Sequence, residues 1–273
     1  MQQKLQTNSI VILKNFVILR NLLFIVMAIL LFFVGHWYLS LFFQTFFHHR
    51  YAAHKMFTMS KFWEKVFYIG SFIAQGSSYL SPYAYAILHR MHHSYADTDK
   101  DPHSPKYSKN IFDMMWKTKV IYNNIVTNKV EVEEKFKKDI PAWHSFDKFV
   151  DLMPIRLLWI PLYFLFYWYF SPHWAWYGLI LIHAIMGPFH GAIINWFAHK
   201  IGYVNFKVND TSKNIMPVDI LMLGEGYHNN HHSHPGRANF GIKWHELDPV
   251  YPIILLFDKL GIIQLRKKII NSL

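Results

Sequence analysis

The feature that most limits the fold is a pair of apolar segments joined by only three residues. The segments MPIRLLWIPLYFLFYWYF (153–170) and WAWYGLILIHAIMGPFHGAIINW (174–196) are separated by Ser-Pro-His. A helix that crosses the apolar core of a bilayer needs roughly 17 to 25 residues, which both segments supply. Backbone groups in lipid must be paired within their own segment, so helices are the expected structure. We therefore predict a transmembrane hairpin over these residues.

An earlier apolar block, within about residues 9–47, leaves its topology open. It is interrupted by Lys14, Arg20, Asn21 and the pair Gly35-His36. Its length suits two short spans with a turn near Gly35 or Arg20, or one span followed by an interfacial helix. We favour the hairpin, which brings the expected number of transmembrane helices to four.

The composition agrees with a membrane protein whose metal chemistry would rest on nitrogen and oxygen. Charged residues make up 16% of the chain, against about 25% in soluble domains. The net charge of +11 favours a cytoplasmic membrane face, and the absence of a nucleic-acid-binding motif predicts no nucleic-acid partner. The chain has no cysteine, which excludes thiolate metal ligands, disulfides and cysteine nucleophiles.

Nine of the 18 histidines lie in three polar stretches just outside the apolar segments. These stretches are HHRYAAHK (48–55), HRMHH (89–93) and GEGYHNNHH (224–232). The last two place histidines at i, i+3 and i+4, which lie within about 60° of their first member on a helix. An even number of crossings between residues 110 and 220 would leave all three stretches on one face of the bilayer. The pattern predicts a shared metal site, since imidazole suits Fe, Zn, Cu and Ni.

The first stretch differs because His49 and His54 are five residues apart, about 140° around an ideal helix. They can reach a common site from a helix end or a distorted turn, or they face two different metals. Eight or more imidazoles exceed the coordination sphere of one metal, so we predict two metals.

Taken together, these motifs resemble the membrane-bound fatty acid desaturases of the acyl-CoA and acyl-lipid Δ9 group, the stearoyl-CoA desaturase-like enzymes. The resemblance covers roughly residues 35–250. Its motifs are HRYAAH at 49–54, HRMHH at 89–93, DTDKDPH at 97–103, NWFAH at 195–199 and GEGYHNNHH at 224–232.

The resemblance implies a set of nine di-iron ligands. They are His49, His54, His89, His92, His93, His199, His228, His231 and His232. It also implies that Asn195 binds through a water and that Glu225 is part of the catalytic site. For Glu225 and Asp101 two roles stay open: orienting imidazoles through the second ring nitrogen, or capping the loops in which they lie. The flanking His48 and His234 are not needed to complete the set.

The implied protein is an all-α, multi-span membrane enzyme with one desaturase domain over residues 1–273. Its cytosolic cap would comprise residues 48–150 and 197–250 and hold the di-metal site. The implied reaction introduces a cis double bond into a saturated acyl chain, using two Fe²⁺ ions, O₂ and an external electron donor. An electron-transfer protein such as ferredoxin or cytochrome b5 would be the donor. We expect a bacterial inner membrane, with the catalytic face and both termini cytoplasmic.

The sequence departs from the animal acyl-CoA enzymes where they hold the CoA group. Ile87 and Leu88 replace an Arg-Asp pair, and Ala192 replaces a Trp. These changes leave a CoA thioester, a membrane lipid and an acyl group on a carrier protein open as the form of the substrate. Two other functions stay open as well: a related di-iron hydroxylase or ketolase, and a non-enzymatic membrane protein that binds metal or haem.

Overall fold

The computed structural model describes residues 2–266, with side chains from residue 14 onward. Helices dominate these residues, as expected for an all-α protein. The elements in chain order are α1 (Gln2–Phe43), η1 (Gln44–Ala53), β1 (Phe57–Met59), α2 (Lys61–Gln75), η2 (Gly76–Ser78), α3 (Pro82–Tyr95), α4 (Ile111–Val126), α5 (Glu134–Lys137), α6 (His144–Val150), α7 (Met153–Leu157), α8 (Trp159–Phe170), η3 (Trp174–Gly178), α9 (Leu179–Ala192), η4 (Ile193–Phe197), α10 (His228–Ser233), α11 (Val250–Lys259) and β2 (Ile263–Leu265).

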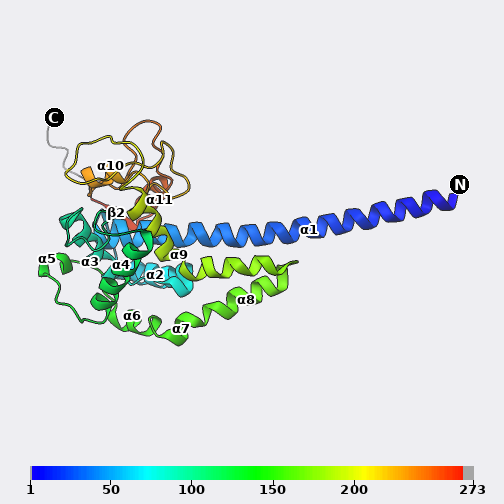
Figure 1. The fold of residues 1–273 in the computed structure, drawn as a ribbon, viewed down its shortest axis with the longest axis horizontal. Helices are drawn as coiled ribbons and strands as arrows, with labels where there is room; N and C mark the ends of the chain where they lie inside the picture. Colours follow the sequence, from blue (N-terminus) through cyan, green and yellow to red (C-terminus); the bar gives the residue numbers. More distant parts are fainter. Residues whose placement is uncertain (1, 267–273) are drawn as a thin grey trace.

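The predicted hairpin over residues 153–196 is present. In Figure 1, α8 and α9 run side by side and pack along the middle of α1. Aromatic side chains fill this contact, with the rings of Phe32 and Phe166 stacked at a centroid distance of 4.0 Å. The buried His183 of α9 lies 2.5 Å from His36 of α1 through their Nδ1 atoms, and its Nε2 lies 2.8 Å from the Tyr167 hydroxyl.

The hairpin expected within residues 9–47 is wrong, because α1 is one continuous helix (Figure 1). A glycine within a helix costs only about 1 kcal/mol relative to alanine, and Gly35 meets no neighbouring atom that would force a turn. Arg20 and Asn21 are exposed on the helix surface, so their polar groups remain free to reach water or headgroups.

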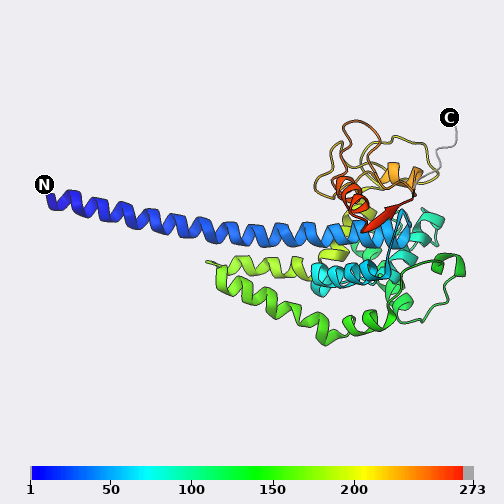
Figure 2. The ribbon, with the colours of Figure 1, turned by 180° about the vertical axis from the view of Figure 1, so that it is seen from behind.

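The described residues contain fewer spans than the four expected. Two helices, Lys14–Ala53 and Trp174–Phe197, are long and apolar enough to cross a membrane. A third span arises if α6 and the α7–α8 segment, bent by 60° at their junction, are counted as one. The start of α1 lies at the opposite end of the molecule from the cap in both views (Figures 1 and 2). The expectation that both termini share one face of the membrane stays a prediction, because residues 267–273 lie outside the described residues.

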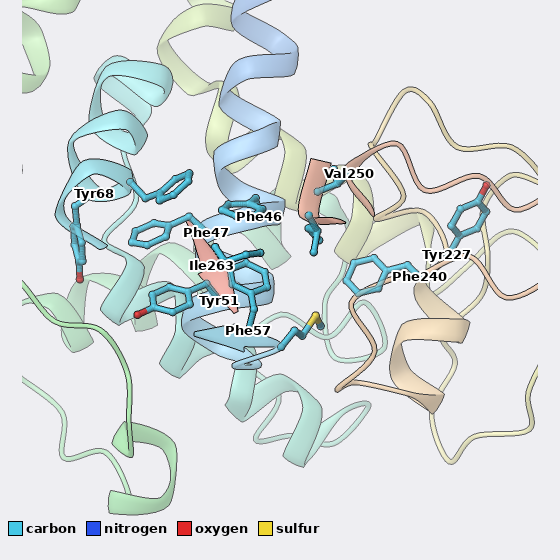
Figure 3. Close-up of a cluster of buried hydrophobic side chains, with 12 residues drawn as sticks. Phe46, Phe47, Tyr51, Phe57, Tyr68, Tyr227, Phe240, Val250 and Ile263 are labelled. Atoms are coloured by element: carbon cyan, nitrogen blue, oxygen red, sulfur yellow. The ribbon is translucent and has the colours of Figure 1, made fainter. Parts of the chain in front are cut away.

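An aromatic core fixes η1 at the base of the cap (Figure 3). Phe46, Phe47 and Tyr51 of η1 pack into a buried cluster with Phe57 of β1 and Ile263 of β2. The two strands pair antiparallel and so tie the C-terminal segment to the chain just after the first histidine stretch. Burying each large apolar side chain contributes about 1.5–3 kcal/mol. The core therefore holds η1 in a set orientation relative to α2 and α11, which also contribute to the cluster.

Candidate metal centre

The nine predicted ligands come together in the cap, where they form two separate groups. In each group, one candidate ligand atom from every residue lies within 4.8 Å of those of all the others. The five-histidine group consists of His49, His54, His89, His93 and His231. The four-histidine group consists of His92, His199, His228 and His232.

Each HxxHH motif divides its histidines between the two groups. In α3, His89 and His93 belong to the five-histidine group, whereas His92 belongs to the other. In α10 the division is reversed, because His231 joins the five-histidine group while the histidines before and after it join the four-histidine group. Residues i and i+4 are about 40° apart on a helix, whereas i+3 and i+4 are about 100° apart. One short motif can therefore serve two neighbouring centres.

The distorted turn expected between His49 and His54 is a π-helix. Residues Gln44–Ala53 form η1, and the backbone N–H of His54 donates to the carbonyl of His49 at 3.1 Å. This i→i+5 bonding brings residues five apart onto one face. Both histidines consequently belong to the same group, and the alternative in which they face two metals is wrong for the described geometry.

In the five-histidine group the Nε2 atoms converge. His49 and His93 lie 3.0 and 2.9 Å from His231 through these atoms. His89 lies 2.7 Å from His54 and 3.0 Å from His93 in the same way. Two nitrogen ligands at right angles on a metal, with bonds of about 2.1 Å, are roughly 3.0 Å apart. The spacing therefore fits a single metal ion bound by these imidazoles.

The four-histidine group has a similar arrangement. The Nε2 atoms of His199 and His228 are 3.1 Å apart. The Nε2 atoms of His92 and His232 are buried and have no hydrogen-bond partner among the described residues. Buried polar atoms normally have a partner. A metal ion at the centre of the group would be the partner for these nitrogens.

The other ring nitrogens of several ligands contact acidic or hydroxyl groups. Nδ1 of His49 lies 2.8 Å from Glu225, and Nδ1 of His92 lies 3.0 Å from Asp101. These are the contacts expected of the two carboxylates, and they are the kind that fixes the orientation of a metal-binding imidazole. Thr45 also donates to Glu225 from the start of η1.

Two further contacts of this kind were missed in the sequence. Nδ1 of His232 lies 2.8 Å from Asp210, and Nδ1 of His199 lies 3.2 Å from the hydroxyl of Thr211. Both residues lie in the segment between η4 and α10, between the NWFAH and GEGYHNNHH motifs, and belong to neither motif. The sequence gives only a weak indication of these two contacts, which is that an Asp and a Thr occur in a polar segment between two histidine motifs.

The surroundings favour neutral imidazoles and charged carboxylates. Burial lowers the pKa of His228, His231 and His232 well below its usual value, and the neighbouring imidazoles lower it further. Burial alone would raise the pKa of Asp101, but the hydrogen bond from His92 is the largest of several effects that outweigh it and bring that pKa to about 2. Neutral imidazole is the form that binds a metal.

The remaining predicted residues lie near the groups without belonging to them. Asn195 lies in η4, a short π-helix that precedes His199, and makes no direct hydrogen bond to a histidine among the described residues. Its role through a water stays a prediction. The two nitrogens of His48 lie 3.1 and 2.8 Å from the carbonyls of Phe43 and Leu80, so this side chain is used in backbone contacts.

Residues that replace the CoA-binding pair of the animal enzymes are buried. Ile87 and Leu88 pack in an apolar cluster with Ala84, Ile125 and Phe136 between α3, α4 and α5. They leave no polar group at these positions for a CoA moiety.

Residues 22–261 match the family described as fatty acid desaturase. The chain is 29% identical to the Delta-9 desaturase-like 2 protein of Arabidopsis thaliana over 228 residues, which cover 80% of this chain and 70% of the relative. It is 30% identical to the sn-1 stearoyl-lipid 9-desaturase of Synechocystis sp., covering 78% of this chain and 64% of the relative. It is also 30% identical to the sn-2 palmitoyl-lipid 9-desaturase of Nostoc sp., covering 82% and 75%.

Proposed function

Since the chain belongs to the fatty acid desaturase family, a family of oxidoreductases, we propose that it is an O₂-dependent Δ9 acyl desaturase with a di-iron centre. The observation that carries the proposal is the division of nine buried or half-buried histidines into two groups with ligand atoms within 4.8 Å. Two adjacent all-imidazole groups suit two metal ions, and imidazole is an accepted ligand of iron.

The proposed role of the metals is to supply chemistry that side chains lack. Two iron ions that receive two electrons can activate O₂ for the removal of two hydrogens from neighbouring methylenes, which acid–base groups alone cannot achieve. The five-histidine group would hold one ion and the four-histidine group the other. Zinc and copper also accept imidazole ligands, so the metal must be identified by analysis of the protein.

The chain's own residues would keep the centre rigid. We propose that Glu225 and Asp101 hold His49 and His92 in one ring orientation and tautomer. Asp210 and Thr211 would do the same for His232 and His199. Arg50 would hold the Glu225 carboxylate in place, because its guanidinium lies 3.5 Å from Glu225 and 2.7 Å from Asp248. Asn195 would contribute through a water.

The acyl group is proposed to be carried on a membrane lipid. The names of the Synechocystis and Nostoc relatives specify lipid-linked acyl chains. The burial of Ile87 and Leu88 also supports a substrate without CoA, since they offer no charge to its phosphates. We further propose a bacterial inner membrane, with the cap on the cytoplasmic side and an external carrier such as ferredoxin or cytochrome b5 as the electron donor.

The test is the fatty-acid profile of a host that lacks its own desaturase. The host would express the intact chain, the His228→Ala variant or the His173→Ala variant, whose altered side chain lies at the tip of the α8–α9 hairpin. Gas chromatography and mass spectrometry with double-bond derivatisation would identify the product. We expect a Δ9 monoene in the hosts that express the intact chain or His173→Ala, and none in the host that expresses His228→Ala. The monoene should be esterified to membrane lipid.

Other products would change the proposal. Hydroxylated or keto lipids in place of the monoene would favour a di-iron hydroxylase or ketolase. Unsaturation confined to the acyl-CoA pool would contradict the lipid-linked substrate but not desaturation itself. The absence of any new product, with the protein in the membrane and a donor supplied, would contradict the proposed reaction.

A further inference from the structure

His103 is a buried histidine beside the metal centre to which the motifs assign no role. It ends the DTDKDPH segment between α3 and α4, and only 5% of its surface is exposed. Neither ring nitrogen has a hydrogen-bond partner among the described residues. Its ring lies against that of His92, with centroids 4.3 Å apart and planes at 34°. A buried imidazole with both nitrogens unpaired is costly, so a partner outside the protein is indicated.

A separate cation site with Asp101 does not explain His103. His92, Asp101 and His103 do lie close enough to share an ion. However, the Asp101 carboxylate is already contacted by three nitrogen groups. These are Nδ1 of His92 and the backbone N–H groups of Asp97 and His103, all at 3.0 Å. The carboxylate is thus engaged in orienting His92 and the loop, and among the described residues neither ring nitrogen of His103 has a hydrogen-bond partner.

Direct binding to the metal of the four-histidine group is also disfavoured. The ligand atoms of His92, His199, His228 and His232 all lie within 4.8 Å of one another, but His103 does not join that set. Two ligands on opposite sides of one metal, with bonds of about 2.1 Å, are only roughly 4.2 Å apart. The ring of His103 therefore lies beside the group, one layer outside its ligands.

We propose that His103 is a positioning residue for the four-histidine centre, and that it holds through a ring nitrogen a water molecule bound to the metal there. The proposal rests on the proposed two-metal function and adds a residue that the nine-histidine pattern does not contain. A buried water needs two to four polar partners, and the imidazole together with the metal supplies the first two. Its contact with His92 places His103 at this centre and leaves the five-histidine centre unaffected.

The test compares His103→Phe, which keeps a flat ring without nitrogens, with His103→Gln, which keeps a hydrogen-bonding group. The control is His144→Phe, which removes an exposed imidazole on α6. Each protein would be loaded with ⁵⁷Fe²⁺ and studied by Mössbauer spectroscopy and by competition with a chelator. We expect His103→Phe to change the Mössbauer signal of one iron only and to weaken the binding of one of the two irons by roughly 10- to 100-fold. His103→Gln should restore much of that signal and much of that affinity.

The outcomes separate this inference from the function on which it rests. An intact protein that binds fewer than two irons contradicts the proposed di-iron centre. Two irons in the intact protein, with signals and affinities unchanged in both His103 variants, overturn the role of His103 alone. Changes in both iron signals, or equal changes in His103→Phe and His103→Gln, would indicate a packing role and also overturn it. If His103→Phe does not fold, His103→Met, which also lacks a hydrogen-bonding nitrogen, takes its place with the same expected and contradicting outcomes.

Discussion

Histidines are buried in both halves of this molecule, but they are used differently. In the cap, nine histidines direct ring nitrogens toward two common points, and several have their second nitrogen fixed by Glu225, Asp101 or Asp210. In the membrane half, His36 and His183 contact each other, and His183 also contacts Tyr167. We refer to these sets as the cap histidines and the span histidines.

The difference shows that burial and proximity of histidines do not by themselves make a metal site. The span histidines pair with each other and with a hydroxyl, and within the part of the chain that the structure describes they belong to no group of three or more candidate ligands. Among the cap histidines, the inward Nε2 atoms of His92 and His232 have no hydrogen-bond partner in the described residues. Convergent nitrogens with carboxylates behind them are the feature typical of metal centres.

Loss of a cap ligand gives the largest expected effect. His93→Ala removes a ligand of the five-histidine group, and His228→Ala removes one of the four-histidine group. Because both metals are needed, desaturation should fall roughly 1000-fold or more in either variant. Monoene formation and bound iron would be measured in membranes with equal amounts of protein. Full activity in either variant would remove that histidine from the proposed ligand set.

Loss of a carboxylate behind a ligand should have an intermediate effect. Asp101→Asn and Glu225→Gln keep the side-chain shape but replace a charged acceptor for His92 and His49 with an amide. We expect metal affinity to fall roughly 10- to 100-fold, measured by chelator competition. The control is Asp99→Asn, an exposed carboxylate in the same loop as Asp101. Equal affinities in Asp101→Asn and Asp99→Asn would show that the contact with His92 has no role in metal binding.

Much of the difference between the cap histidines and the span histidines was predictable from the sequence, because the cap histidines lie in local motifs. The nine histidines follow fixed spacings, and Glu225 and Asp101 lie within the same motifs. Asp210 and Thr211 were missed because the loop that brings them to α10 is ordered by tertiary contacts. The π-helix of η1 was expected only as one of several distortions, since the spacing of His49 and His54 does not specify how the helix deforms.

The topology of the apolar block within residues 9–47 could not be decided from local sequence motifs. Gly35 and Arg20 are weak turn signals, and a helix can pass through both when nothing opposes it. Contacts between α1 and the α8–α9 hairpin, such as the stacking of Phe32 on Phe166, lie on the part of the helix that contains Gly35. Such contacts join residues far apart in the chain and leave no local pattern.

The hydrogen bonds of Glu246 stabilise the cap independently of the metals, and this contribution can be tested by mutation. Its carboxylate accepts from Asn230 of α10, from Tyr203 and from the backbone of Ile242 and Lys243, at distances of 2.8 to 2.9 Å. Glu246→Gln replaces one acceptor oxygen with a donor facing other donors. We expect a loss of about 1–3 kcal/mol in stability and less than tenfold in activity, measured by thermal unfolding in detergent. An unchanged unfolding temperature would contradict this role.

The lowered pKa of Glu246 leads to a prediction of how the stability of the cap changes in acid. Burial alone would raise the pKa of Glu246, but the backbone donors of Lys243 and Ile242 and the side chains of Tyr203 and Asn205 outweigh it and lower the pKa from 4.5 to about 2. A carboxylate whose pKa is lowered on folding stabilises the protein above its unfolded pKa, and this stabilisation is lost as the pH falls toward the folded value. The intact protein should lose stability between about pH 4.5 and 2, and Glu246→Gln should lose less of it over that range. Parallel curves for the two proteins would contradict this.

The span histidines should give the smallest effect on activity. His183→Phe leaves the buried hydroxyl of Tyr167 and the ring of His36 without their partner, which costs about 1–3 kcal/mol in stability. Iron content should be unchanged and desaturation should stay within about twofold, because neither histidine directs a nitrogen toward the cap groups. Adding Tyr167→Phe and His36→Phe should recover part of the stability, since removing all the partners leaves no polar atom unpaired. If His183→Phe instead lost an iron, the contrast between the two sets of histidines would fail, and the pairing of His36 with His183 would need a role in the metal centre.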